Sequence, residues 1–252
     1  MAVYTQVDDA ALADFLSAYD LGTLLSFAGI AEGVENSNFL LRTDRANYIL
    51  TLYEKRVDPQ DLPFFIEVME VLAGSGMSCP LPVRARDGSI LQQLAGRPAA
   101  VFSFLDGTWS RYPNREKCAA LGRTLASLHL KTAPVTRLRE NALGPAEWRP
   151  LLDSIGDDAD ILRAGMGETI RTRLDSILVD WPEGLPRGVI HADLFPNNVL
   201  FIGDELTGVI DFYFACNDIL AYDLGTCLNS WCFEADGSFN LTKSRAMLGG
   251  YN

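Results

Sequence analysis

The chain has 252 residues, 48% hydrophobic and 21% charged, which is enough to bury a substantial core in one large or two modest domains. With 21 basic against 33 acidic residues, its formal net charge of −12 argues against nucleic acid and anionic membranes as partners. No signal peptide opens the sequence, no apolar run approaches the ~18 residues of a membrane helix, and the five cysteines form no C-x-x-C pair, so we expect a cytoplasmic protein with reduced thiols.

The first hundred residues predict a β-rich unit with two helices. Apolar residues at helical spacing predict helices over residues 8–19 and 61–73. Short β-branched and alternating runs predict strands over residues 24–30, 37–42, 48–53, 81–84, 89–94 and 99–104. A glycine-containing loop over residues 29–38 can fold over phosphates with its backbone N–H groups, and an ordinary hairpin loop is the alternative. The residues predicted to bind nucleotide there are Gly33, Asn36, Ser37 and Asn38.

The rest of the chain predicts a mainly helical unit. Helical spacing recurs over residues 114–129, 168–181, 223–231 and 241–248. Between these runs, residues 132–150 have the composition of a loop and residues 156–160 that of an acidic connector. His129 is expected to be a core or helix-end histidine, because no second ligand lies at metal spacing. The sequence stops inside a helical pattern, which suggests that C-terminal helices are missing; a natural end on a short helix is the alternative.

Residues 188–223 hold the candidate catalytic groups. Asp193, Asn198 and Asp211 lie at the ends of short apolar strands, so three oxygen-bearing side chains stand on rigid supports. Such ligands suit Mg²⁺ and phosphate, and phosphoryl transfer also needs a group that accepts the proton of an attacking hydroxyl. Asp193 is predicted to be that base, with Asn198 and Asp211 binding Mg²⁺. A polar hairpin in which these residues only form turns is the alternative.

The spacing H-x-D-x-x-x-x-N followed by I-D-F resembles the catalytic loop and metal-binding aspartate of protein kinases. With Ala192 after the histidine and Asp223 in Tyr-Asp-Leu, the segment is more similar to the aminoglycoside phosphotransferase and choline kinase group. The resemblance implies an α+β, protein-kinase-like two-lobe fold. Its N-terminal lobe would be an antiparallel β-sheet with one helix, and its C-terminal lobe mainly helical. The resemblance also implies ATP and Mg²⁺ as cofactors.

The same resemblance implies a hinge between two lobes. A strand that ends near Phe104 leads into a short glycine-bearing crossing, and the backbone at Ser103 and Leu105 would hydrogen-bond adenine. Residues 1–105 would then form the N-terminal nucleotide-binding lobe, and residues 106–252 the catalytic and substrate lobe.

Two further residues would support the catalytic loop structurally. His191 precedes the proposed base, and we expect a buried brace in preference to a second base. Asp223 lies in an apolar helical pattern and, by resemblance, would accept backbone hydrogen bonds from the loop.

The sequence departs from the kinase pattern at one position. Thr51 stands on the third strand where kinases place the lysine that contacts the phosphates, and Lys55 and Arg56 follow with uncertain direction. Glu67 and Glu70 are the candidates for the helix glutamate that pairs with such a lysine. We therefore expect amides of the 36–38 loop and Mg²⁺ to neutralise the phosphates.

A closer likeness extends over nearly the whole chain. It is carried by residues 19–22, 29–33, 35–39, 61–65, 191–195, 210–213 and 228–231, which resemble the homoserine kinases of the aminoglycoside-phosphotransferase-like type. The resemblance implies that ATP and L-homoserine give ADP and O-phospho-L-homoserine in threonine biosynthesis. It also implies a small-molecule substrate as partner, for a monomer or a homodimer. Asp218 and Glu234 are predicted to bind the substrate ammonium.

Two other functions remain open at this stage. One is a kinase for another small hydroxyl compound, such as choline, ethanolamine or an aminoglycoside. The other is an inactive nucleotide-binding module, which Thr51 favours and the complete set of Asp193, Asn198 and Asp211 opposes.

Overall fold

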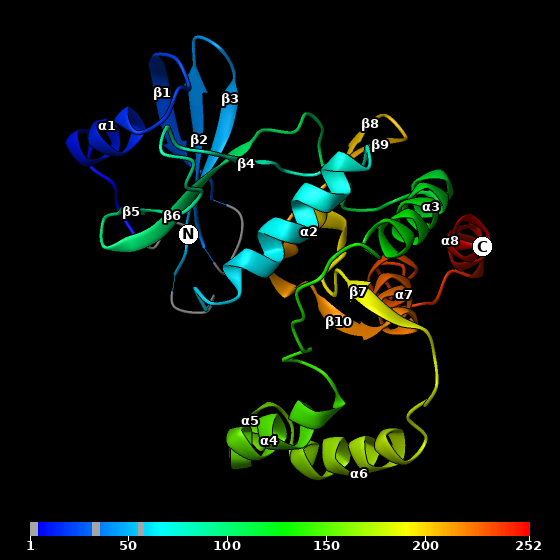
Figure 1. The fold of residues 1–252 in the computed structure, drawn as a ribbon. Coiled ribbons are helices and arrows are strands. Elements are labelled where there is room, and N and C mark those ends of the chain that lie inside the picture. Colours follow the sequence, from blue (N-terminus) through cyan, green and yellow to red (C-terminus); the bar gives the residue numbers. More distant parts are fainter. Residues whose placement is uncertain (1–4, 32–35, 55–57) are drawn as a thin grey trace.

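The computed structural model describes residues 5–31, 36–54 and 58–252. A β-rich N-terminal part and a mainly helical C-terminal part lie side by side, and helix α2 (Leu62–Gly74) runs between them (Figure 1). The helices α4 (Pro145–Ile155), α5 (Ala159–Leu162) and α6 (Met166–Val179) form a separate group below the other helices in this view.

An antiparallel sheet forms the N-terminal part. Its main path runs in the order β1 (Leu24–Gly29), β2 (Ser37–Thr43), β3 (Asn47–Leu52), β6 (Arg97–Ser103) and β4 (Pro82–Val83), and β5 (Gln92–Leu94) also pairs with β6. Successive residues of a strand face opposite sides of a sheet. Val101 accordingly packs with α1 (Asp9–Ser17) on one face, whereas Ala100 and Phe102 pack with α2 on the other.

Helix α2 joins the two parts through one continuous core. Leu62, Phe65 and Leu72 of this helix are buried in the same apolar cluster as Leu121 and Trp231 of the C-terminal part. Burying apolar area in a shared core stabilises both parts and fixes how they face each other. Side chains of α2 therefore lie at the boundary between the two parts.

Two predicted strands are shorter than the sequence indicates. The run at 81–84 keeps only β4, because Pro80 and Pro82 have no N–H to donate to a sheet ladder. The run at 89–94 keeps only β5, since Ser89 donates both its N–H and its hydroxyl to Asp87 and so belongs to the preceding turn.

The C-terminal part contains two short strand pairs and three main helices besides the α4–α6 group, among the residues described. Strand β7 (Arg187–Ile190) pairs with β10 (Cys216–Ile219), and β8 (Val199–Ile202) pairs with β9 (Glu205–Val209). The 3-10 turn η2 (Pro196–Asn198) precedes β8, and η3 (Phe212–Phe214) follows β9. Helix α7 (Leu220–Trp231) continues directly from β10. The other two main helices of this part are α3 (Arg115–Lys131) and α8 (Leu241–Tyr251).

Helices α3 and α8 cross closely at a pair of glycines. A Cβ atom built on Gly122 would lie 2.1 Å from the carbonyl oxygen of Met247, and one on Gly250 would lie 2.3 Å from that of Ala119. No side chain fits at such distances, so glycine is required at both positions for the helices to approach this far.

The loop predicted over 132–150 is wrong in its last six residues. Helix α4 begins at Pro145, where proline at the first helical position needs no hydrogen-bond acceptor. Trp148 of α4 packs edge-on against Trp181 at a centroid distance of 5.0 Å, which holds the helix against the end of α6. The predicted acidic connector lies in the 3-10 turn η1 (Gly156–Asp158) and in α5.

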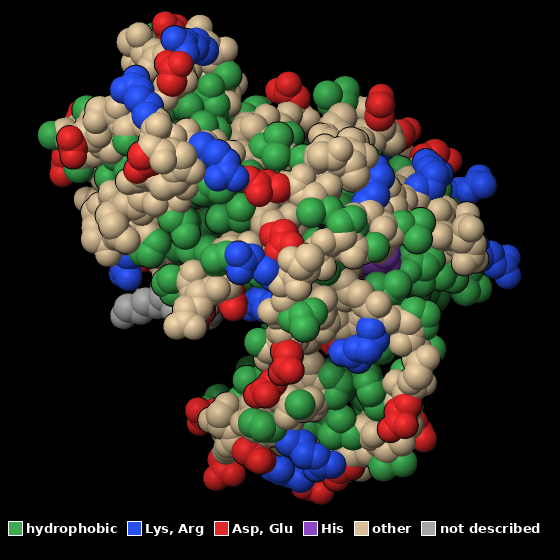
Figure 2. Space-filling model, viewed as in Figure 1, with side chains coloured by type: hydrophobic (Ala, Val, Ile, Leu, Met, Phe, Trp, Pro, Cys, Tyr) green, Lys and Arg blue, Asp and Glu red, His purple; other side chains and the backbone are tan. Residues whose placement is uncertain are grey.

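The surface of the α4–α6 group mixes both signs of charge. Arg149 pairs with Asp175 and Arg171 with Asp153, and Figure 2 shows basic and acidic side chains close together over these helices.

Elsewhere the five cysteines are free and buried, as the sequence predicts. Among the described residues, no helix is long and apolar enough to cross a membrane.

Candidate active site

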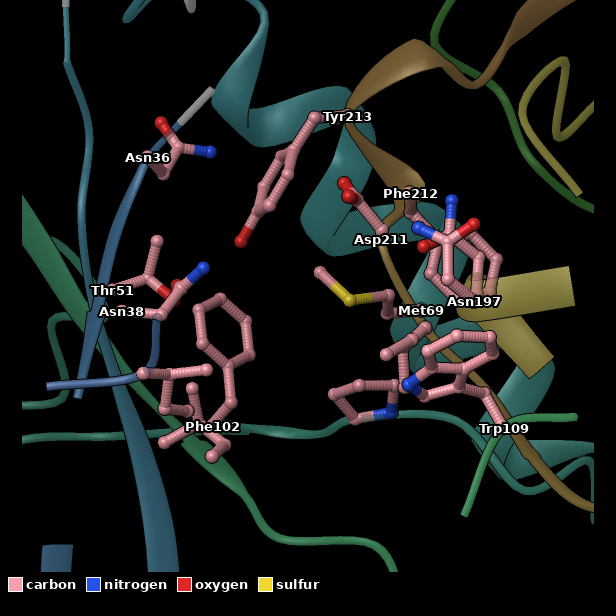
Figure 3. A pocket seen from close by; sticks show the side chains of 15 residues that line it. Asn36, Asn38, Thr51, Met69, Phe102, Trp109, Asn197, Asp211, Phe212 and Tyr213 are labelled. Atoms are coloured by element: carbon pink, nitrogen blue, oxygen red, sulfur yellow. The ribbon is translucent and has the colours of Figure 1, made fainter. Parts of the chain in front are cut away.

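A cavity of about 450 Å³ lies between the two parts. The described residues of the N-terminal part contribute neutral polar and apolar side chains, and the C-terminal part contributes Trp109 and the residues that flank the β8–β9 pair (Figure 3). Its lining consists of Ile30, Asn36, Asn38, Ile49, Thr51, Met69, Pro80, Phe102, Trp109, Asn197, Asn198, Ile210, Asp211, Phe212 and Tyr213.

The loop after β7 places Asp193 beside Asn198. The amide nitrogen of Asn198 donates to both the main-chain oxygen and the carboxylate Oδ2 of Asp193, each at 2.8 Å. These two bonds hold the Asp193 carboxylate in one orientation. They also orient the Asn198 amide, because its nitrogen is used as the donor and its oxygen is left as an acceptor. The Asn198 side chain lines the cavity.

Asp211 is brought to the same place by the β8–β9 pair. The N–H of Ile210 donates to the carbonyl of Asn198 at 3.0 Å, which fixes the spacing between the ends of the two strands. Asp211 then adopts a left-handed backbone (φ 66°, ψ 63°), a strained conformation that surrounding structure must impose on a non-glycine residue. Asn198 and Asp211 both line the cavity, and one carboxylate with one amide oxygen fits a divalent cation that also binds phosphate oxygens.

Buried groups behind the loop hold its backbone. Asp223 accepts the N–H of His191 at 2.8 Å and that of Ala192 at 3.0 Å, and Ala192 has a left-handed φ of 64°. Asp223 also accepts from His129 Nε2 at 3.1 Å, and His129 Nδ1 shares a hydrogen bond of 2.8 Å with the hydroxyl of Tyr251. A carboxylate with this many donors is stable in a buried site.

His191 spans from the loop to the strand that leads to Asp211. Its Nε2–H donates to the carbonyl of Ile210 at 3.0 Å, and its Nδ1 accepts the N–H of Asp193 at 3.3 Å. Acceptance at Nδ1 requires the neutral ring. Burial lowers the pKa of His191, which favours the same neutral form. No ring nitrogen is left to act as a base, so the geometry agrees with a bracing role.

The described residues on the N-terminal wall of the cavity are polar or apolar and carry no charge. The hydroxyl of Thr51 donates to Asn38 Oδ1 at 2.7 Å. Glu54 lies beside this wall, where its carboxylate accepts the Ser37 hydroxyl at 2.8 Å and its N–H donates to Asn36 Oδ1 at 3.3 Å. Asn36, Asn38 and Thr51 therefore face the cavity from a fixed strand pair. Gly33, also predicted to bind nucleotide, lies outside the described residues.

The predicted hinge residues lie near the cavity without lining it. The N–H of Ser103 donates to the carbonyl of Leu81 at 2.9 Å, and its hydroxyl accepts the Leu81 N–H at 2.9 Å. Leu105 packs against Gly208. The adjacent Phe102 does line the cavity, and with Ile49 it supplies an apolar surface for a planar ring.

The two glutamates proposed to pair with a lysine face away from the cavity. Glu67 accepts the N–H and hydroxyl of Thr136, each at 2.8 Å, and these bonds lower the pKa of its carboxyl. Glu70 pairs with Arg84. Met69 is the residue of α2 that lines the cavity instead.

Both residues predicted to bind the substrate ammonium are held by cations of the chain. Asp218 is buried, where it pairs with Arg187 at 3.2 Å and accepts from the amide of Asn141 at 2.8 Å. Glu234 pairs with Lys243 at 2.8 Å and lies outside the cavity lining. Their role towards a substrate stays a prediction.

Sequence reasoning did not identify several lining residues. Tyr213 bridges the two parts, because its hydroxyl lies 3.2 Å from that of Tyr53 and its ring packs edge-on against Phe65. Burial raises the pKa of Tyr213, so the hydroxyl stays protonated and can donate. Its place two residues after Asp211 was the only signal in the sequence. No sequence signal pointed to Trp109, Met69 or Phe102, because strand and helix patterns do not show which apolar residue faces a cleft.

Comparison with known proteins gives one family. A model of the phosphotransferase enzyme family matches residues 26–252. A homoserine kinase of Azorhizobium caulinodans is 57% identical over 251 residues, which cover 100% of this chain and 78% of that protein. A homoserine kinase of Xanthobacter autotrophicus is 58% identical, with the same coverage.

Solved structures of low sequence identity share the fold. A spectinomycin phosphotransferase in complex with ADP and spectinomycin has a TM-score of 0.74 at 16% identity, covering 98% of this chain and 80% of that one. An amicoumacin kinase in complex with AMP-PNP and Ca²⁺ has a TM-score of 0.74 at 18% identity, covering 97% and 77%. The α+β, protein-kinase-like fold predicted from the sequence is confirmed.

Proposed function

The chain belongs to the phosphotransferase enzyme family, and on that premise we propose that it transfers the γ-phosphoryl group of ATP to the hydroxyl of L-homoserine. The product is O-phospho-L-homoserine, an intermediate of threonine biosynthesis. The resemblance to the homoserine kinases is confirmed by relatives that are 57% and 58% identical over the whole chain. We place the reaction in the cytoplasm, with small molecules as the only partners it needs.

The observation that carries the proposed mechanism is the set of oxygen ligands on one side of the cavity. Asp193 is held by Asn198, and Asn198 lines the same cavity as Asp211. We assign Asp193 the role of orienting the substrate hydroxyl and accepting its proton. The bond between the γ-phosphorus and the bridging oxygen breaks as the bond to the homoserine oxygen forms, and ADP leaves.

Asn198 and Asp211 are assigned to a divalent cation, which we propose is Mg²⁺. When bound, the cation would neutralise charge that develops on the phosphate oxygens during transfer. The chain's own contribution is to hold one amide and one carboxylate at fixed spacing. The left-handed backbone of Asp211 and the bond from Ile210 to Asn198 keep that spacing.

The remaining cavity accommodates the nucleotide. Phe102, Ile49 and Met69 offer apolar contact for adenine. Asn36, just before β2, and Ser37 and Asn38, the first residues of β2, are assigned to the phosphates. The backbone from Ser103 to Leu105 stays the proposed adenine partner, without the N–H of Ser103, which donates to the carbonyl of Leu81. We assign the phosphate charge to the cation and to amide donors. No Lys or Arg of the described residues lines the cavity, and Lys55 and Arg56 lie outside the described residues.

A substrate panel tests the acceptor. The kcat/KM of the full-length enzyme is measured by coupled ADP release with L-homoserine, choline, ethanolamine and kanamycin. We expect homoserine to lead by at least ~10²-fold, because a site that pairs two fixed charges rejects molecules that leave one unpaired. A preference for choline or kanamycin would overturn the acceptor but keep the kinase, whereas no ADP release with any alcohol would favour an inactive nucleotide-binding module.

A further inference from the structure

A second cavity, of about 420 Å³, adjoins the catalytic loop. Its lining includes Asp61, Phe65, Arg139, Ala192, Tyr213 and Tyr222. Ala192 directly precedes Asp193, and Tyr213 lines this cavity as well as the nucleotide cavity. The two cavities are therefore neighbours at the proposed base, and a molecule in the second one can present a hydroxyl to Asp193.

Arg139 is fixed in this cavity by its backbone and its side chain. Its N–H donates to Asn217 Oδ1 at 2.9 Å, and its carbonyl accepts the Asn217 N–H at 2.7 Å. Its Nη1 donates to the carbonyl of Ala215 at 3.1 Å, and the guanidinium lies 5.0 Å from the ring centre of Phe65. The side chain thus gives up little conformational freedom when a ligand binds.

Asp61 completes an ion pair across the two parts of the molecule. Arg139 Nε donates to Asp61 Oδ2 at 2.7 Å, and the side chains are 17% and 34% exposed. Asp61 precedes α2, yet its side chain makes no capping bond to that helix. In the part of the chain that the structure describes, the pair uses neither Nη2 of Arg139 nor Oδ1 of Asp61.

We propose that this Arg139–Asp61 pair recognises the zwitterionic end of an α-amino acid acceptor. Arg139 receives the carboxylate through its free fork nitrogen, and Asp61 receives the ammonium through its second oxygen. The inference rests on the proposed function and names the groups that select its substrate. An ion pair of zero net charge matches a zwitterion, because each ligand charge finds an opposite charge when both lose water.

Two other carboxylates nearby are paired with cations of the chain itself. Asp218 accepts the amide of Asn141, the N–H of Ile219 and the charge of Arg187. It therefore supports Asn141 at the wall of the cavity. Glu234 is paired with Lys243 outside it. Asp61 combines a place in the lining with an oxygen unused by the described residues and with Arg139 as its ion-pair partner. Asp58 also lines the cavity, where its Oδ1 accepts the N–H of Gln60.

Three acceptors separate the two halves of the pair. L-Homoserine carries both charges, 3-aminopropan-1-ol lacks the carboxylate, and 4-hydroxybutanoate lacks the ammonium. Each is measured as an acceptor by coupled ADP release or, if turnover is undetected, as a competitive inhibitor against homoserine. With the unaltered enzyme, homoserine should exceed both analogues by roughly 10²-fold in kcat/KM, since each analogue leaves one charge unpaired.

The variants should divide the acceptors according to charge. Arg139→Gln should lower kcat/KM by roughly 10- to 100-fold for homoserine and 4-hydroxybutanoate, and leave 3-aminopropan-1-ol nearly unchanged. Asp61→Asn should weaken homoserine and 3-aminopropan-1-ol and spare 4-hydroxybutanoate. Arg139→Lys keeps the charge without the fork, so it should restore part of the loss. The KM for ATP should move little in all of them.

Arg137→Gln is the matched control. Arg137 lies on the same segment and also pairs with a carboxylate of α2, Glu67, at 3.4 Å, but it does not line the second cavity. This variant removes a similar contact between the two parts and should keep the order of the three acceptors. Melting temperatures of all variants identify any that unfold.

The outcomes separate the two proposals. An unaltered enzyme that does not phosphorylate homoserine would overturn the proposed function. An enzyme that does, while folded Arg139 and Asp61 variants lower all three acceptors alike or none of them, would overturn the pair as the zwitterion site and leave the proposed function standing.

Discussion

The two walls of the nucleotide cavity differ in charge and in how they are held. The C-terminal wall carries Asp211 and Asn198, with Asp193 beside them, and Asp223 and His191 fix its backbone. The N-terminal wall carries Asn36, Asn38 and Thr51, which are neutral. Carboxylates on one wall can recruit a cation, and neutral donors on the other do not compete with it for the phosphates. Among the described residues, this contrast fits the proposal above, in which a divalent cation supplies positive charge at the site.

The first way to test this contrast is to remove the proposed base. Asp193→Ala should lower kcat by ~10²–10⁴-fold with little change in the KM for ATP, because proton acceptance and orientation are lost while the nucleotide wall is intact. Coupled ADP release measures both constants. Asp204→Ala, in the exposed β8–β9 turn, is the control and should behave as the unaltered enzyme. A near-native kcat in Asp193→Ala would contradict the assignment.

The second test concerns the cation. Activity should disappear with excess EDTA and return with Mg²⁺. Asp211→Asn should raise the Mg²⁺ concentration for half-maximal activity more than Asn198→Ala does, because it removes a charge together with a ligand. Titration of activity with Mg²⁺ gives both values. Sustained turnover in EDTA would show that the carboxylate wall does not act through a metal.

The third test concerns the brace on the C-terminal wall. Burial lowers the pKa of His191, so the unfolded chain binds a proton more readily than the folded one. Stability from the neutral ring is present above the unfolded pKa of about 6.5 and declines as pH falls below it. The unfolding free energy should drop by up to about 1.4 kcal/mol per pH unit below that value.

Urea unfolding between pH 7.5 and 5 measures this decline. His191→Gln should be less stable at pH 7.5 and show a flatter pH dependence. His129→Gln, which changes the only other histidine of the chain, controls for loss of a buried ring. An unchanged slope in His191→Gln would mean that other groups titrate.

The smallest effect is expected on the N-terminal wall. Thr51→Ala removes one hydrogen bond, to Asn38 at 2.7 Å, so the KM for ATP should change by less than about fivefold. Thr51→Val, which keeps the shape of the side chain, is the companion variant. A collapse of ATP affinity in both would show that Thr51 contacts phosphate and that the neutral wall does more than position amides.

The sequence predicted the parts of the molecule that depend on short spacing. The helices at 61–73 and 114–129 and the central strands follow from periodicity, and the protein-kinase-like fold is confirmed. Asp193, Asn198 and Asp211 could be grouped because strand ends and a fixed interval place them together. The helix beginning at Pro145 was missed, since one proline and a tryptophan contact decide it.

Contacts between distant residues could not be predicted in the same way. Arg139 meets Asp61 across 78 positions, and Asn217 meets the backbone of Arg139 through strand β10, which has too many polar residues to read as a strand. The orientation of Glu67 towards Thr136, away from the cavity, also depends on how α2 docks. Local patterns contain no information on such pairings until the helices are placed.

The two backbone hydrogen bonds that Asp223 accepts also affect how the catalytic loop opens. The N–H groups of His191 and Ala192 donate to the two oxygens of one carboxylate on α7. We therefore expect the two hydrogen bonds to open together when α7 and the loop separate. Their hydrogens should exchange with deuterated water at closely similar rates, through a single opening event. Slow, matched exchange at these two neighbours would time the opening of the catalytic loop directly, without any substrate present.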